Sequence, residues 1–222
     1  MPGLPLTLAL EHYDRHLPLL EGHVAPEGID LHVAHVTVEA GRHERMLNYR
    51  EWDACELSLS SYLMAKARGA PLTAVPVFPR RLFSQSQMYV NAGAGVEEPR
   101  DLIGKRVGLR SFQTTLSVLA KGDLQHEYGV PLDQVTWVTS ADEPVPFDPP
   151  PGVHIERAPR GQHIETMLVE GVIQLSASRR RMARFPPDHP TGPGSPGRTG
   201  ATEDHLRECG EIVRAADMRR HA

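Results

Sequence analysis

The fold class follows from LTLALEHYDR, residues 6–15. The apolar run Leu6–Leu10 is followed at once by charged and aromatic side chains. A buried strand whose carboxyl end opens into polar residues has this pattern. In parallel sheets, ligands bind beyond such strand ends. The stretch therefore predicts an α/β protein with candidate site residues just past this strand, at His12, Asp14, Arg15 and His16.

Strand and helix signals alternate over the first ninety residues. We expect strands at 6–10, 29–36, 53–58 and 73–78, and helices at 38–52 and 60–68. Apolar and polar residues alternate in Ile29–Val36 at the period of two of a strand, and Gly69 is suited to end the second helix. This alternation predicts a largely parallel sheet flanked by helices.

A second α/β lobe is predicted from residue 91, because Asn91–Gly95 is a run of small residues of the kind that joins lobes. We expect a turn that leads into a strand at 102–109, further strands at 135–138 and 152–156, and helices at 111–128 and 162–171. The predicted domains are therefore a first lobe at 1–90 and a second lobe at 91–173.

The composition changes after Ile173. Residues 174–200 contain five Arg, five Pro and four Gly but few large apolar side chains. Such a segment buries too little apolar surface to offset its ordering entropy. We predict a divergent, largely disordered tail at 174–222. A reading-frame change in a GC-rich gene is the alternative explanation of this composition.

Charge and composition exclude several classes of protein. A formal net charge of -4 gives no electrostatic reason to expect nucleic acid as a partner. No apolar run is long enough to span a membrane. Two cysteines are too few for a disulfide framework, and the N-terminus lacks the pattern of a secretory signal. We therefore expect a cytoplasmic protein whose partner is a small molecule. Whether the protein forms a homo-oligomer stays open.

Three residues at or near the ends of predicted strands are candidates for acid–base chemistry. His12 and Asp14 follow the first strand, and Glu56 lies inside an otherwise apolar strand. His12 and His16 have the i, i+4 spacing of a metal pair, but a third ligand is missing, so we predict no metal. Surface or helix-capping roles are the alternative for this cluster.

Five further residues are candidates for holding an anion. Ser58 and Ser60 lie at a predicted strand-to-helix turn, where capping the helix is the alternative. Arg80 follows the predicted fourth strand, and a guanidinium can bind a carboxylate through two hydrogen bonds. Gln113 and Thr114 begin the long helix of the second lobe, where helix capping explains one of them.

Several of these stretches together resemble the 4,5-dihydroxyphthalate decarboxylase family over about residues 6–173. The resemblance rests on the segments 12–15, 26–31, 56–62, 76–80, 102–108 and 124–130. It implies a type II periplasmic-binding-protein-like fold, in which two lobes close on a ligand. Members of the family continue beyond the position of Ile173 with elements that return to the first lobe. Residues from 174 do not resemble that continuation, so the first lobe is expected to be incomplete.

The resemblance implies a carboxy-lyase that acts on a dihydroxylated aromatic dicarboxylate. In that interpretation His12 carries out the proton transfer. Asp14 or Glu56 either orients His12 or takes the proton of the phenolic hydroxyl. Arg80 and the Ser58, Ser60 and Thr114 region hold carboxylates. The chemistry needs no organic cofactor, and we predict none. Two alternatives stay open: a non-catalytic binding protein for a small anionic or aromatic ligand, and an inactive fragment.

Overall fold

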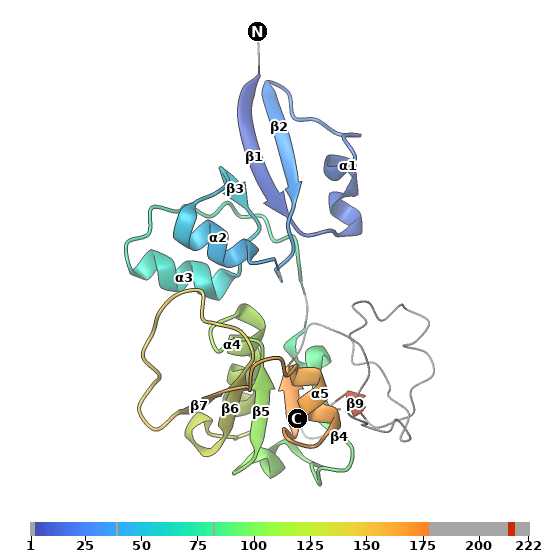
Figure 1. The fold of residues 1–222 in the computed structure, drawn as a ribbon, viewed down its shortest axis with the longest axis vertical. Helices are drawn as coiled ribbons and strands as arrows, with labels where there is room; N and C mark the ends of the chain where they lie inside the picture. The colour runs from blue at the N-terminus through green and yellow to red at the C-terminus, as the bar shows by residue number, and fades with distance from the viewer. Residues whose placement is uncertain (1–2, 39, 82, 178–212, 216–222) are drawn as a thin grey trace. The chain divides into compact units, whose positions relative to one another are not determined.

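A computed structural model describes residues 3–38, 40–81, 83–177 and 213–215 (Figure 1). Contacts within the chain group them into two compact units. The first unit holds the described residues up to Arg81 together with Pro144–Pro146, and the second holds the other described residues. Strand β4, Met88–Asn91, therefore lies in the second unit, although we predicted the change of lobe after residue 90.

The first unit is built on a three-stranded parallel sheet in the order β2-β1-β3. Its elements are β1 (Leu4–Leu10), a 3-10 turn (Asp14–His16), α1 (Leu17–Leu20), β2 (Ile29–His35), α2 (Arg42–Tyr49), β3 (Ala54–Cys55) and α3 (Leu59–Ala67). Leu10 is paired with His35, so the carboxyl ends of β1 and β2 lie side by side. The small core contains Ala9 of the central strand, Met46 of α2 and Trp52.

The strand predicted over residues 73–78 is wrong, because Thr73–Phe78 forms no strand. Val75 and Val77 are 71% and 67% exposed. Pro76 between them has no N–H group for a neighbouring strand. Residues of high strand propensity form a strand only where a sheet supplies a partner. Among the described residues, the sheet of this unit ends at β3 on one side and at β2 on the other.

The second unit has a mixed sheet in the order β7-β6-β5-β8-β4-β9, in which β4 runs antiparallel to both of its neighbours. Its strands are β4, β5 (Arg106–Leu109), β6 (Thr136–Thr139), β7 (His154–Arg157), β8 (Leu175–Ala177) and β9 (Val213–Ala215). Its helices are α4 (Thr115–Gly122) and α5 (Ile164–Val169), with 3-10 turns at Ser84–Gln87, Pro99–Leu102 and Leu132–Gln134 and a π-helical turn at Asp123–Glu127.

Helices α4 and α5 cover opposite faces of this sheet (Figure 1). Val107 and Leu109 of β5 lie in one apolar cluster with Ala120 of α4. The residue between them, Gly108, faces Ile164 of α5, because successive strand residues point to opposite faces. The unit is thus a three-layer α/β structure, and the predicted α/β class is confirmed.

Gly108 is a site where a side chain does not fit. A Cβ atom built there lies 2.3 Å from Cδ1 of Ile173 and 2.8 Å from Cγ2 of Ile164. We expect Gly108→Ala to lower the free energy of unfolding by about 1–3 kcal/mol, the usual cost of overpacking a core. Gly122→Ala is the control: Gly122 has open space around it in α4, and the change should stabilise by about 0.4–1 kcal/mol. Denaturant unfolding that gives Gly108→Ala the stability of the wild type would contradict this packing.

The tail predicted from residue 174 begins too early. Leu175, Ser176 and Ala177 form β8, are at most 2% exposed and pair with both β4 and β5. Two apolar residues are enough to form this buried strand, because the neighbouring strands β4 and β5 supply the rest of the core. Further along, Val213–Ala215 forms β9 against β4, inside the region predicted to be disordered. The other residues of the predicted tail lie outside the described part of the chain.

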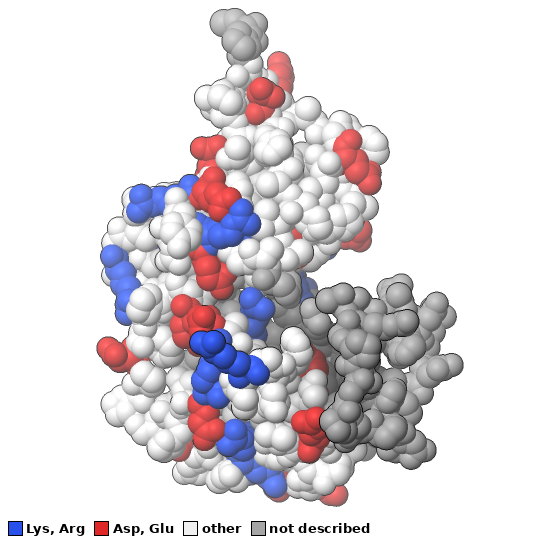
Figure 2. All heavy atoms as spheres, in the orientation of Figure 1, with Lys and Arg blue, Asp and Glu red and all other residues white. Residues whose placement is uncertain are grey.

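Surface charge is mixed on the face drawn in Figure 2, where Lys and Arg side chains lie among Asp and Glu. This distribution fits the formal net charge of -4. None of the helices in the described ranges combines the length and the apolar character that crossing a membrane requires.

Candidate functional site

A buried arginine organises the carboxyl end of the sheet in the first unit. Arg42 begins α2 and is 0% exposed. Its Nη1 donates to the Val36 carbonyl at 2.6 Å and to Glu11 Oε2 at 3.3 Å. Its Nε donates to the Glu56 carbonyl at 3.1 Å, and its Nη2 forms an ion pair with Glu56 Oε2 at 3.3 Å. One guanidinium thus joins the segments that follow β1, β2 and β3.

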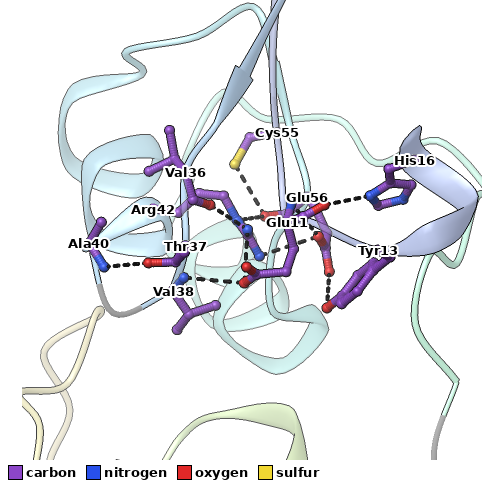
Figure 3. A network of polar contacts seen from close by, with 10 residues as sticks. All are labelled: Glu11, Tyr13, His16, Val36, Thr37, Val38, Ala40, Arg42, Cys55 and Glu56. Carbon is purple, nitrogen blue, oxygen red and sulfur yellow. Dashed lines mark hydrogen bonds and ion pairs between the residues drawn. The ribbon is translucent and has the colours of Figure 1, made fainter. Parts of the chain in front are cut away.

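Glu56 is the predicted site residue with the most contacts in this network (Figure 3). Its side chain is 11% exposed. Besides the ion pair with Arg42, Oε2 accepts a hydrogen bond from the Glu11 N–H at 3.2 Å. The other oxygen, Oε1, accepts a hydrogen bond from the Tyr13 hydroxyl at 3.2 Å. The carboxylate therefore has one oxygen bound to the protein frame and one bound to a phenol.

Aromatic and cationic contacts fix the Tyr13 ring. The Arg15 guanidinium lies 4.5 Å from the ring centroid, over its face. Arg15 Nε donates to the Pro79 carbonyl, so the cation is anchored in turn. The His16 ring is tilted against Tyr13 at 5.0 Å, and His16 Nδ1 lies 2.8 Å from the Glu11 carbonyl oxygen. Tyr13 thus has both its ring and its hydroxyl oriented.

His12 and Asp14 lie outside this buried network. Both are exposed beyond the carboxyl end of β1. The His12 ring is 5.1 Å from that of His35, the last residue of β2. Asp14 pairs with Arg15 at 3.4 Å, and its side chain is 90% exposed. Within the described part of the chain, no hydrogen bond or ion pair joins either residue to Glu56.

The predicted anion-binding residues of the first unit follow β3 and α3. Ser58 is the residue before α3, and its hydroxyl lies 3.3 Å from that of Ser60. Its side chain does not cap the helix. Arg80 is half-buried, whereas Arg81 is exposed.

In the second unit, a carboxylate holds the turn that leads into α4. Glu143 accepts hydrogen bonds from the backbone N–H groups of Phe112 at 2.6 Å and Gln113 at 3.1 Å. Gln113 is only 2% exposed. The Thr114 hydroxyl is 2.9 Å from that of Ser117, one turn along the helix. The two predicted residues Gln113 and Thr114 are thus neighbours on an anchored turn.

A buried lysine completes this turn. Lys121 is 6% exposed, and its Nζ donates to the Phe112 carbonyl at 2.7 Å and lies 2.9 Å from the centroid of the Phe112 ring. Burial lowers the pKa of Lys121 to about 7, and the Glu143 carboxylate opposes the shift. An amine in this setting changes its charge near neutral pH.

The depressed pKa of Lys121 predicts a pH-dependent stability. In the folded chain Lys121 loses its proton at about pH 7. In the unfolded chain Lys121 keeps its proton above that pH, because the ordinary pKa of lysine is 10.5. The free energy of unfolding should therefore rise with pH from about pH 7 to about pH 9, by at most about 1.4 kcal/mol per pH unit. Below about pH 7 Lys121 is charged in the folded chain, and burial of that charge destabilises the fold by its full amount. Above about pH 9, the pKa of Cys55, raised by burial to about 12, adds the opposite slope.

Denaturant unfolding of Lys121→Met between about pH 7 and about pH 9 tests this. The variant should lose the slope, because it has no amine to titrate. Lys66→Met is the control, since Lys66 is exposed, and it should keep the slope of the wild type. Equal slopes for the wild type and Lys121→Met would show that Lys121 keeps its proton in the folded chain.

Sequence reasoning missed the residues that surround the predicted ones. Arg42 lies one helical turn before Met46, a core residue, and this spacing indicates a buried arginine that needs acidic partners. Glu11 and Tyr13 lie beside the predicted residues His12, Asp14, Arg15 and His16, but which side chain turns inward depends on the backbone. Glu143 is distant in sequence from the turn that it holds, and no local pattern predicts that contact. Among the described residues, no group of three or more His, Cys, Asp or Glu side chains is placed to bind a metal.

Comparison with known proteins identifies the family. Residues 21–146 match the family described as NMT1/THI5 like. Over 197 residues the chain is 36% identical to a 4,5-dihydroxyphthalate decarboxylase of Comamonas testosteroni and 33% identical to one of Pseudomonas putida. Each alignment covers 86% of this chain, which spans 59% of the Comamonas protein and 76% of the Pseudomonas protein. The chain belongs to the NMT1/THI5-like family and to the same family as these two 4,5-dihydroxyphthalate decarboxylases.

Proposed function

We propose that this protein is a carboxy-lyase that removes carbon dioxide from 4,5-dihydroxyphthalate or a closely related dihydroxylated aromatic dicarboxylate. The observation that carries the proposal is the identity of 36% and 33% to two proteins named for that activity, over 86% of the chain. The charged and aromatic groups at the carboxyl end of the sheet in the first unit support it, because an acid–base reaction needs such groups at one place.

The chemistry assigns roles to these groups. A ring hydroxyl para to the leaving carboxylate gives up its proton, and its electrons flow into the ring. The ring carbon that bears the carboxylate takes a proton, the bond to that carboxylate breaks, and carbon dioxide leaves. The phenol then regains its proton, so the reaction consumes one proton in total. A base for the phenol, an acid for the ring carbon and a partner for the retained carboxylate are required.

We assign the acid to His12, because histidine is the side chain that exchanges a proton near neutral pH. Glu56 is the base, supported by its fixed carboxylate, and Asp14 is retained as the second candidate. The carboxylates of the substrate are assigned to Arg80 and to the hydroxyls of Ser58 and Ser60. From the second unit, Gln113 and Thr114 are assigned to substrate binding, supported by the anchored turn that carries them.

The type II periplasmic-binding-protein-like fold is part of the proposal, supported by the α/β character of both units and by the family match. A cytoplasmic location and a homo-oligomeric state remain predictions.

The test combines turnover with binding. Purified protein is mixed with 4,5-dihydroxyphthalate, carbon dioxide release is measured, and the same ligand is titrated by calorimetry. Release of one carbon dioxide per substrate supports the decarboxylase. Binding without release would favour a binding protein, and neither binding nor release would remove this substrate class.

A further inference from the structure

We propose that Tyr13 is a further catalytic residue, whose hydroxyl contacts a ring hydroxyl of the substrate and passes that proton to Glu56. This inference rests on the proposed decarboxylase function and adds a residue that stands between the substrate and the base. It follows from the way in which the Glu56 carboxylate is enclosed.

Glu56 is poorly placed to touch a substrate directly. Its side chain is 11% exposed, and Oε2 is bound by the Glu11 N–H and faces the Arg42 guanidinium. The remaining oxygen, Oε1, accepts the hydrogen bond from Tyr13. In Figure 3 the Tyr13 hydroxyl points at the carboxylate, whose other side faces Arg42. A proton that reaches Glu56 from outside this network therefore comes most directly through the Tyr13 hydroxyl.

Tyr13 is suited to such a relay because it is held in place and partly open. The residue is half-buried, whereas the Arg42 side chain is 0% exposed. The Arg15 cation over the ring and the tilted His16 ring restrict the ring. Orienting a reacting group before the substrate arrives removes part of the entropic cost of reaction. A cation over a phenol ring also favours negative charge on its oxygen during transfer.

The relay balances without any further reactant. The substrate hydroxyl gives its proton to the Tyr13 oxygen as Tyr13 gives its own proton to Glu56 Oε1. The electron pair left on the substrate oxygen flows into the ring, and His12 protonates the ring carbon. After carbon dioxide leaves, the same two protons return along the relay. Tyr13 and Glu56 finish in their starting states, and His12 is reprotonated from water.

Tyr13→Phe tests the relay, because it removes one oxygen and keeps the ring under Arg15. We expect kcat to fall by about 10²-fold or more, the lower end of the range for acid–base groups. Tyr62→Phe is the matched control in the same unit: the Tyr62 hydroxyl accepts a hydrogen bond from the Ala74 N–H at 3.2 Å, and we assign it no part in the reaction. Its kcat should stay at the wild-type value.

A binding measurement separates contact with the ring hydroxyls from general damage. Calorimetric titrations use 4,5-dihydroxyphthalate and phthalate, which lacks both hydroxyls. Tyr13→Phe should weaken the binding of 4,5-dihydroxyphthalate by roughly 3- to 10-fold, the usual effect of one lost hydrogen bond. The affinity for phthalate should stay unchanged. Equal weakening of both ligands would show a structural effect and overturn the contact.

The outcomes distinguish this inference from the proposed function. If the wild type releases carbon dioxide and Tyr13→Phe matches Tyr62→Phe in kcat, the relay is wrong and the decarboxylase stands. If the wild type neither binds nor converts 4,5-dihydroxyphthalate, the proposed function fails and the relay fails with it.

Discussion

Arg42→Met should destabilise the first unit by about 3–5 kcal/mol, the usual cost of removing one partner from a buried ion pair. The guanidinium is 0% exposed, and the side chains of Glu11 and Glu56 are 15% and 11% exposed. Without Arg42, two carboxylates are left close together in a poorly solvated place. Methionine keeps the length of the side chain, so the loss is one of charge and hydrogen bonds more than of volume.

Hydrogen exchange of the β1 and β2 amides measures this effect within the first unit. Protection should fall together for both strands in Arg42→Met. Arg45→Met is the matched control on the same helix, because Arg45 pairs with Glu51 at the surface, and protection there should change little. Adding Glu11→Gln and Glu56→Gln to Arg42→Met should restore part of the protection, since no buried charge is then left unpaired. Unchanged exchange in Arg42→Met would mean that the network contributes nothing to the sheet.

Local sequence patterns predicted most of the elements but not their limits. The period-two alternation of Ile29–Val36 gave β2 within one residue. The helix predicted at 38–52 is shorter, because Gly41 and Arg50 both have left-handed backbone conformations, with φ of 77° and 50°, and they bound α2. Charged residues in the flanks favoured a helix by composition, whereas the backbone turns at those two positions ended it.

The largest errors in the fold concern residues whose structure depends on distant partners. Thr73–Phe78 has the composition of a strand but no strand beside it. Conversely, Leu175–Ala177 has too little apolar surface to predict a buried strand, yet it lies between β4 and β5. Strand formation depends on the neighbours that the sheet supplies, and a single-chain pattern does not contain them.

The same limit applies to the candidate site. Glu56 was recognisable because a charged residue inside an otherwise apolar stretch has to find a partner, although the strand itself ends one residue earlier, at Cys55. Its partners come from positions 43 and 14 residues away, Tyr13 and Arg42, and no spacing rule links them. The Glu143 contact with Phe112 is also remote, at 31 residues apart. Sequence therefore indicated where charged and polar residues are concentrated, and the fold decided which of them are buried, paired or exposed.

His12→Gln should reduce the rate of decarboxylation by about 10²- to 10⁴-fold, the range for a positioned acid–base group, while the affinity for substrate stays nearly unchanged. His12 is exposed beyond the carboxyl end of β1, so proton transfer there would not require a buried charge. Glutamine keeps the hydrogen-bonding capacity but does not exchange a proton near neutral pH. The proposed anchors for the carboxylates, Arg80 and the Ser58 turn, are untouched, which is why binding should survive.

Single-turnover rates and calorimetric affinities for 4,5-dihydroxyphthalate separate the two effects. His32→Gln is the control, because His32 is an exposed histidine on β2, opposite Thr7 in the middle of the sheet, and its rate should equal that of the wild type. A loss of affinity that matches the loss of rate would make His12 a binding residue. A wild-type rate in His12→Gln would transfer delivery of the proton to Asp14, because the proposed relay assigns the phenolic proton to Glu56 and Tyr13. The acid and the base of the reaction would then both be carboxyl groups.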